Sequence, residues 1–267
     1  MSDIESGYVA VDGMNVYYES RGTGGTPLIV VHGGFGTTSQ IAGLLDELAR
    51  DRRVVAIELQ GHGHTADIDR PFRWEHFGDD IAGVITGLDL GPADLLGYSL
   101  GAGSCLRAAV QHPELVHRLV VVSFPFARNG NHPDVLANME HVGSAGLAQM
   151  KMTPMFDAYA AVAPDVDGFG MLMDRMGELL RTPYDWADDV KGLPMPVLLM
   201  FGDADSVPPA HAAEFFGLLG GGRRDGVWDR SGVTEHRLAL LPGVTHYEMF
   251  DHPGLPATVT SFLDASA

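Results

Sequence analysis

The chain is poor in several residue types, and each scarcity excludes a class of protein. Cys105 is its only cysteine, so the 267 residues can form neither an intrachain disulfide nor a cysteine-rich metal site. Lys and Arg number 17 against 35 Asp and Glu, and the formal net charge of −18 disfavours nucleic acid and anionic membrane as partners. No run approaches eighteen consecutive apolar residues, and residues 1–5 lack the apolar core of a secretory signal. We therefore expect a cytoplasmic protein with no nucleic-acid or membrane partner.

What is present is typical of a folded globular chain. Hydrophobic residues make up 45% and charged residues 19% of the sequence. The acidic residues are dispersed, with pairs such as Asp79 and Asp80 as the longest runs, so the excess charge first predicts solubility. The length suits one large domain.

Strand-like and helix-like runs alternate along most of the chain. Residues 8–11 and 14–18 alternate in polarity around Asp12-Gly13, which predicts a hairpin. Further strands are predicted at 27–31, 54–59, 93–98, 119–123, 197–201 and 238–241. Helices are predicted at 39–48, 74–88, 100–111, 209–219 and 256–264. This order predicts an α/β fold with a mostly parallel central sheet flanked by helices.

The alternation stops between residues 124 and 190. This stretch lacks a clear strand, whereas Leu172, Met176, Leu179 and Leu180 keep helical spacing. We predict a helical cap inserted at 124–190 into a core made of 1–123 and 191–267. A second, smaller insertion at 220–236 is rich in Gly and Arg and predicts a surface loop or short hairpin.

The most informative motif is Gly-Tyr-Ser-Leu-Gly at 97–101, between a predicted strand and a predicted helix. Gly-x-Ser-x-Gly in this context is typical of a nucleophile elbow, in which the serine sits on a strained turn above the sheet. The helix N-terminus behind it offers free N–H groups where an oxyanion develops. We predict Ser99 as the nucleophile and the Leu100 amide as an oxyanion donor.

A second glycine-rich segment, at residues 32–36, directly follows the first buried strand and reads His-Gly-Gly-Phe-Gly. The Gly34 amide is the predicted second oxyanion donor, and the Phe35 amide is the neighbouring candidate. A phosphate-binding loop is disfavoured, because the P-loop Lys-Ser/Thr and the dinucleotide Gly-x-Gly-x-x-Gly spacing are both absent.

A serine nucleophile needs a base, and the base needs an orienting acid. Among twelve histidines, His246 follows the predicted strand 238–241 after a predicted turn, so we expect it at the same sheet edge as Ser99. His252 is predicted to be structural. Two aspartates, Asp203 and Asp205, follow the strand 197–201, and the order Ser, Asp, His is that of the α/β-hydrolase arrangement.

Three other histidines allow other interpretations. His62 and His64 have His-x-His spacing, but no carboxylate or cysteine is spaced to complete a metal site, and we predict no metal. His32 is predicted to hydrogen-bond within its own loop.

The motifs at 97–101, 32–36 and 202–208, together with His246, resemble the α/β-hydrolase fold superfamily over essentially the whole chain. The resemblance implies that the acid is the Asp of a Gly-x-x-Asp segment ahead of a proline, which is Asp205, leaving Asp203 to stabilise the loop. Where family members commonly have Asp-x-x-Gly-x-Gly-x-Ser, this chain has Glu58 and Thr65 at the ends, a departure at a structural turn. Serine in place of a nucleophilic aspartate argues against the dehalogenase and epoxide-hydrolase branches.

The candidate triad predicts a cofactor-free serine hydrolase that cleaves carboxylic esters or lactones through an acyl-enzyme. We expect small to medium, largely uncharged substrates, because the −18 disfavours anionic ones unless an arginine such as Arg128 compensates. Rings and flexible thioethers of the insertion suit a substrate pocket, and Phe124, Phe126 and Met155 are its predicted lining. Phe35 is a further candidate wall. The small-molecule substrate is the one partner expected, and the protein is predicted to be a monomer or homodimer.

Four alternatives share this fold. A perhydrolase or haloperoxidase-like enzyme and a carbon–carbon bond hydrolase would use the same triad. A proline iminopeptidase is suggested by residues 32–36, but Tyr98 stands where its elbow carries tryptophan. A ligand-sensing receptor would keep the triad without steady turnover.

Overall fold

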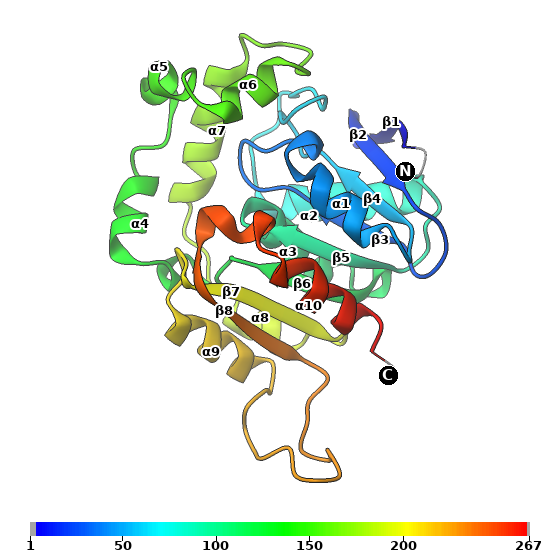
Figure 1. Ribbon diagram of the computed structural model, residues 1–267. Helices are drawn as coiled ribbons and strands as arrows, with labels where there is room; N and C mark the ends of the chain where they lie inside the picture. Colours follow the sequence, from blue (N-terminus) through cyan, green and yellow to red (C-terminus); the bar gives the residue numbers. More distant parts are fainter. Residues whose placement is uncertain (1–3, 266–267) are drawn as a thin grey trace.

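The computed structural model describes residues 4–265 as one eight-stranded, mostly parallel sheet with helices on both faces (Figure 1). The strands are β1 (Glu5–Val11), β2 (Met14–Arg21), β3 (Leu28–Val31), β4 (Val54–Ile57), β5 (Ala93–Tyr98), β6 (Val116–Val122), β7 (Val197–Ala204) and β8 (Arg237–Thr245). The α-helices are α1 (Ala42–Leu48), α2 (Trp74–Gly87), α3 (Leu100–Gln111), α4 (Pro133–Met139), α5 (Leu147–Met150), α6 (Pro154–Ala160), α7 (Phe169–Arg181), α8 (Ala187–Lys191), α9 (Pro209–Leu218) and α10 (Gly254–Leu263). Within residues 4–265, no helix combines the length and apolar character needed to cross a bilayer.

The strand order is β1-β2-β4-β3-β5-β6-β7-β8. Strands β1 and β2 form the predicted hairpin, whose turn residues Asp12 and Gly13 both have positive φ. Strand β2 pairs antiparallel with β4, and all pairings from β4 through β8 are parallel. The carboxyl ends of β5, β6, β7 and β8 therefore meet at one edge of the sheet.

The continuous apolar runs of the central strands reflect burial on both faces. In β3, Leu28 and Val30 pack into the core on the α1 and α10 side, whereas Ile29 and Val31 pack into the core on the α2 and α3 side. Successive side chains of a strand point to opposite faces, so a strand covered on both sides must be apolar throughout. The two cores anchor the strand ends that carry the polar residues described below.

Most predicted elements are confirmed with ends that differ by a few residues, and one of these differences affects the site. The predicted strand 238–241 does not end before a turn, because β8 continues to Thr245 and its pairing with β7 shifts between Gly202 and Ala204. Such an irregularity re-aims the end of a strand without ending its pairing. His246 therefore follows β8 directly.

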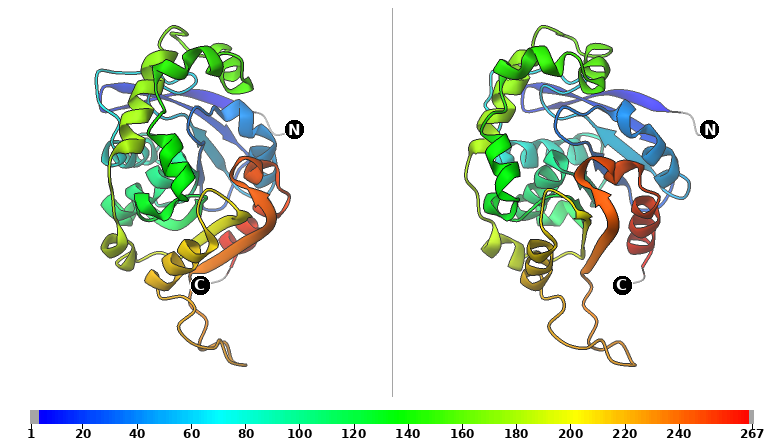
Figure 2. Two further views of the ribbon diagram at one scale, coloured as in Figure 1. Left: turned by 90° about the vertical axis from the view of Figure 1, so that its left-hand side faces the viewer. Right: turned by 60° about the vertical axis from the view of Figure 1, so that its left-hand side comes forward.

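Residues 124–190 contribute no strand to the sheet. They contain α4 to α7 and α8 up to Val190, with one isolated bridge between Ala127 and Asp185. In Figure 2, α4 and α7 stand side by side along one flank of the sheet. The stretch 219–236 has no helix or strand and projects from the body (Figure 2), as expected of a surface loop. Its Trp228 side chain is fully exposed.

Candidate active site

Ser99 occupies the tight turn between β5 and α3. Its backbone angles, φ 52° and ψ −115°, lie in a region that a non-glycine residue rarely adopts. The Ser99 amide donates to the Val122 carbonyl at 2.9 Å, and its carbonyl accepts from the Gly103 amide at 3.0 Å. The strained turn, held by these two bonds, has the geometry that the Gly-x-Ser-x-Gly motif predicts.

The glycines on either side of Ser99 are required by close backbone contacts. A Cβ on Gly97 would overlap the Gly101 carbonyl, and a Cβ on Gly101 would overlap the carbonyls of Val31 and His32. Strand β5 can therefore approach the start of α3 only because Gly97 lacks a side chain, and α3 can approach β3 and its following loop only because Gly101 lacks one.

Gly97→Ala is expected to lower the free energy of unfolding by about 3 kcal/mol or more, because the added methyl overlaps backbone that cannot move aside. Urea denaturation followed by circular dichroism measures the effect. Gly217→Ala in α9 is the matched control, since a Cβ there meets nothing within 4 Å, and it should raise the unfolding free energy by about 0.5–1 kcal/mol. Equal stabilities of the two variants would contradict the steric requirement at the elbow.

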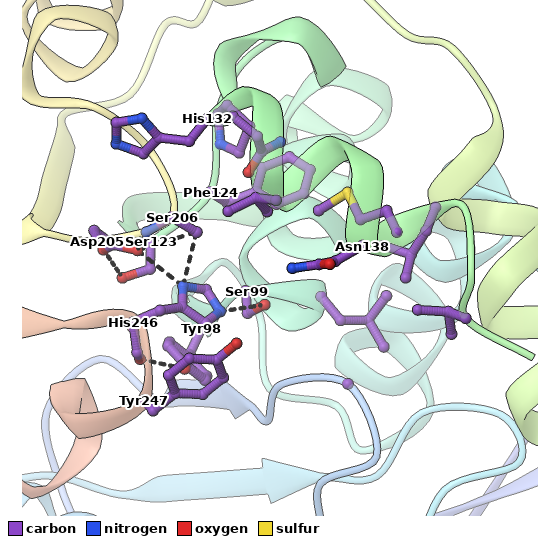
Figure 3. A pocket seen from close by; sticks show the side chains of 18 of the residues that line it. Tyr98, Ser99, Ser123, Phe124, His132, Asn138, Asp205, Ser206, His246 and Tyr247 are labelled. Atoms are coloured by element: carbon purple, nitrogen blue, oxygen red, sulfur yellow. Dashed lines mark hydrogen bonds and ion pairs between the residues drawn. The ribbon is translucent and has the colours of Figure 1, made fainter. Parts of the chain in front are cut away.

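Ser99, His246 and Asp205 form one hydrogen-bonded chain (Figure 3). His246 Nε2 lies 3.1 Å from Ser99 Oγ, and His246 Nδ1 lies 2.9 Å from Asp205 Oδ1. A carboxylate accepts only, so Nδ1 carries the proton and Nε2 is free to accept from the serine. The structure thus brings together the three residues predicted as nucleophile, base and acid, from the ends of β5, β8 and β7.

The Asp205 carboxylate is fully buried and accepts several hydrogen bonds. Oδ2 accepts from Ser123 Oγ at 2.5 Å and the Gly202 amide at 3.2 Å, and Oδ1 accepts from the Ser206 amide at 2.6 Å in addition to His246. Burial would raise the pKa of Asp205, but the hydrogen bond and charge of His246, with the bonds from Ser123 and Gly202, outweigh it and hold the pKa below its usual value. Asp205 is therefore ionised at neutral pH.

Asp203 has a different role. Its side chain is exposed, and its Oδ1 accepts from the Gly243 amide at 2.7 Å, which ties the end of β7 to β8. The structure places it as a loop-stabilising residue, in agreement with the sequence prediction.

The loop after β3 brings Gly34 and Phe35 to the same cavity as Ser99 and Leu100. A turn between the Gly33 carbonyl and the Gly36 amide (3.0 Å) shapes it, and Phe35 has φ 60°. His32 is buried within this loop, with Nδ1 2.6 Å from the Gly33 carbonyl, while its Nε2 accepts from the Leu59 amide. His32 thus bonds its own loop as predicted, and the assignment of the Gly34 and Leu100 amides as oxyanion donors stays a prediction.

His62 and His64 are both accounted for by neighbours in the fold. His62 Nδ1 lies 3.0 Å from the Gln60 carbonyl, and burial together with the charge of His32 lowers its pKa to about 3. His64 donates from its amide (2.5 Å) and its ring Nδ1 (3.0 Å) to the buried Glu58 carboxylate. Across residues 4–265, no three His, Cys, Asp or Glu side chains are grouped to hold a metal ion.

The departures from the family pattern at Glu58 and Thr65 are mutually compatible. The Glu58 carboxylate also accepts hydrogen bonds from the amide and the hydroxyl of Thr38. Thr65 Oγ1 donates to the Glu58 main-chain carbonyl at 2.7 Å and accepts from the Tyr17 amide. The longer carboxylate thereby anchors the start of η1 (Thr38–Ile41), just beyond the glycine-rich loop.

A cavity of about 770 Å³ opens above Ser99. One wall is aromatic and aliphatic, and a second carries polar side chains from the start of segment 124–190. The lining comprises Gly34, Phe35, Trp74, Tyr98, Ser99, Leu100, Ser123, Phe124, Pro125, Arg128, Asn131, His132, Asp134, Val135, Asn138, Met139, Val142, Met155, Met176, Leu180, Tyr184, Ala204, Asp205, Ser206, Thr245, His246 and Tyr247. In Figure 3 the Asn138 side chain lies on the Ser99 side of α4.

The predicted pocket residues Phe124 and Met155 do line this cavity, but Phe126 does not. Phe126 stacks on His211 (centroids 4.2 Å apart) and packs on Phe215 of α9. Phe126 was predicted to line the pocket because it closely follows a sheet strand. Strand β6 ends at Val122, and Ser123, with φ 56°, redirects the chain so that Phe126 packs against α9.

Several lining residues have no motif that points to them. Trp74 and Tyr184 belong to an aromatic cluster with Phe124, and Trp74 comes from the start of α2, far from the other walls in sequence. Ser123 and Ser206 could be found by position. Ser123 directly follows strand β6 and Ser206 directly follows Asp205, at the edge of the sheet where Ser99 lies.

The fold and this site define the class of protein. The alpha/beta hydrolase fold family model matches residues 26–151. The chain is also 32% identical over 265 residues to 2-(acetamidomethylene)succinate hydrolase of Mesorhizobium japonicum, covering 92% of this chain and 91% of that protein. The chain therefore belongs to the α/β-hydrolase fold superfamily.

One further relative matches part of the chain, and one solved structure shares its fold over nearly the whole length. 2-Hydroxymuconate semialdehyde hydrolase of Pseudomonas is 38% identical over 110 residues, and the match spans 38% of this chain and only 39% of that protein's length. The crystal structure of a Bacillus subtilis carboxylesterase superposes with a TM-score of 0.75 at 21% identity, covering 99% of this chain and 93% of that one.

Proposed function

We propose that this protein is a serine hydrolase that cleaves carboxylic esters or lactones through an acyl-enzyme. The observation that carries the proposal is the continuous hydrogen-bonded chain from Ser99 Oγ through His246 to the buried Asp205, at the floor of a cavity. A serine, an acceptor nitrogen within hydrogen-bond reach and an orienting carboxylate are the parts that nucleophilic acyl transfer needs.

In the proposed reaction, His246 Nε2 accepts the Ser99 proton as Oγ attacks the ester carbonyl carbon. The Leu100 and Gly34 amides donate to the resulting oxyanion. The carbonyl re-forms, the bond to the alcohol breaks, and His246 returns its proton to the departing alkoxide. Water then gives a proton to His246 and attacks the acyl-enzyme, releasing the acid and restoring Ser99 when His246 returns the proton to Oγ.

The charges around the cavity support uncharged substrates. Arg128 is the one Lys or Arg among its lining residues, and its guanidinium donates to Glu140 at 2.5 Å and to the Leu180 carbonyl at 2.7 Å. The neighbouring carboxylate offsets the positive charge, so an anionic substrate gains little there. The many apolar residues among the lining suit an aliphatic or aromatic acyl or alcohol group. We also propose that segment 124–190 acts as the cap that determines this selection.

We expect kcat/KM for p-nitrophenyl esters to rise by about fourfold per added methylene from acetate upward, because each buried methylene contributes about 0.8 kcal/mol, until the chain fills the cavity. A monomethyl ester of a dicarboxylic acid should be hydrolysed at least about tenfold more slowly than the dimethyl ester of the same acid. The reason is that Arg128, the one Lys or Arg among the lining residues, is already paired with Glu140 and cannot offset the free carboxylate of the substrate.

A lactone panel is run in parallel. A serine-directed phosphonate should label Ser99, located by peptide mass spectrometry.

A second candidate is carbon–carbon bond hydrolysis, favoured by the 38% identity to 2-hydroxymuconate semialdehyde hydrolase across 110 residues. That semialdehyde therefore belongs in the same panel. Its turnover without ester or lactone turnover would replace the first proposal by the second, and no turnover together with no label on Ser99 would reject both.

A further inference from the structure

Tyr98, the last residue of β5, touches the backbone that carries His246. Its hydroxyl donates to the His246 carbonyl at 2.5 Å, and its ring lies against the imidazole with centroids 5.1 Å apart and planes inclined by 33°. Figure 3 shows Tyr98 beneath the imidazole, on the side away from His132. The residue that precedes the nucleophile in sequence thus contacts both the ring and the main chain of the base.

The same tyrosine also packs against the glycine-rich loop. A Cβ on Gly33 would lie 2.8 Å from Tyr98 Cδ1 and Cε1, so the absence of a side chain at Gly33 lets the ring fit. On its other side the ring packs on Phe250 of η5 (His246–Asp251), with centroids 4.3 Å apart. Tyr98 therefore lies where the elbow, the loop after β3 and the loop carrying His246 meet.

We propose that Tyr98 is a positioning residue that fixes the distance between His246 Nε2 and Ser99 Oγ, an inference that rests on the proposed function. Polar groups hold His246 at both ends. Asp205 Oδ1 (2.9 Å) and the Ser206 hydroxyl (3.0 Å) lie at the ring Nδ1, and Tyr98 holds the main chain at the carbonyl. Asp205 bonds only the ring, so the place of the His246 main chain depends on the end of β8, on η5 and on the Tyr98 hydrogen bond. Small displacements of a catalytic group have large effects on rate.

The chemistry of the phenol suits this role. Burial raises the pKa of Tyr98, and the charge of Asp205 adds to the shift, so the hydroxyl keeps its proton and remains a donor throughout the working pH range. Because the hydroxyl donates to the His246 carbonyl, its loss should change the position of His246 more than it changes the affinity for substrate.

Tyr98→Phe tests the proposal, because it keeps the ring contacts and removes only the anchor. We expect kcat for a p-nitrophenyl ester to fall by about five- to twentyfold with KM within about twofold of wild type, and the phosphonylation rate of Ser99 to fall with kcat. Tyr159→Phe is the matched control. Its hydroxyl also donates to a main-chain carbonyl, that of Asp165 at 2.9 Å, from a buried ring that does not line the cavity.

Thermal unfolding of both variants separates stability from catalysis. A similar loss of stability in both, with loss of kcat only in Tyr98→Phe, supports the positioning role. Unchanged kcat in Tyr98→Phe, an equal fall in Tyr159→Phe, or a rise in KM at constant kcat would overturn it. These outcomes leave the wild-type ester turnover and Ser99 label intact, whereas failure of the proposed function removes both and the positioning role with them.

Discussion

Ser99→Ala should lower kcat/KM for a p-nitrophenyl ester by about 10,000-fold or more, leaving only the background that binding and oxyanion donors provide. The hydroxyl is the only group of Ser99 that reaches His246 Nε2, and alanine has no atom that can form the acyl-enzyme. The measurement is initial velocity across substrate concentration, with phosphonate labelling as an independent readout.

Ser104→Ala is the control for this variant. Ser104 is buried in α3, the helix that follows Ser99, and its hydroxyl donates to the Leu100 carbonyl at 2.8 Å without lining the cavity. It should keep near-wild-type activity and label normally. Full activity of Ser99→Ala would reject the serine mechanism outright, whatever the substrate.

Asp205→Asn should lower kcat/KM by about 1,000- to 10,000-fold, whereas Asp203→Asn should change it by less than about threefold. Both Asp205 oxygens accept from two or more donors, including Ser123 Oγ and the Ser206 amide. Whichever of the two oxygens the asparagine NH2 group replaced, it would face hydrogen-bond donors. His246 would also lose the carboxylate acceptor that keeps the proton on Nδ1.

The pair of variants also differs in pH dependence. Because the folded-state pKa of Asp205 is depressed, its ionisation stabilises the fold above the ordinary aspartate pKa, and this stabilisation is lost as pH falls through the folded pKa. In urea denaturation between about pH 3 and 7, the free energy of unfolding should fall less steeply with decreasing pH in Asp205→Asn than in Asp203→Asn. Equal activity losses in the two variants would contradict the assignment of Asp205 as the acid.

Sequence reasoning succeeded where local chemistry leaves few choices. The run Leu28–Val31 is apolar because both faces of the sheet are covered, and the glycines of the elbow are necessary because the turn contacts other backbone. Gly-x-x-Asp ahead of a proline distinguished Asp205 from Asp203, and the structure places the first beside His246 and the second in a loop contact.

It failed where the chain leaves a regular element. The extension of β8 to Thr245 depends on an irregular pairing with β7, and no local pattern predicts which residues a partner strand will accept. Phe126 was assigned to the pocket by its distance from a strand, but the positive φ of Ser123 turned it toward α9.

The sequence by itself determined the fold class, the order of strands and helices along the chain and the candidate nucleophile and base, and its resemblance to the family selected Asp205 over Asp203 as the candidate acid. Periodicity, steric demands within five residues and the order of motifs along the chain can all be read without knowing the tertiary contacts. Only the tertiary structure decided that Tyr98 donates a hydrogen bond to the His246 carbonyl, that Ser123 donates to Asp205 and that Trp74 lines the cavity. These contacts join residues from different strands and helices, and their geometry follows from how the sheet twists and the helices pack, which no short stretch of sequence encodes.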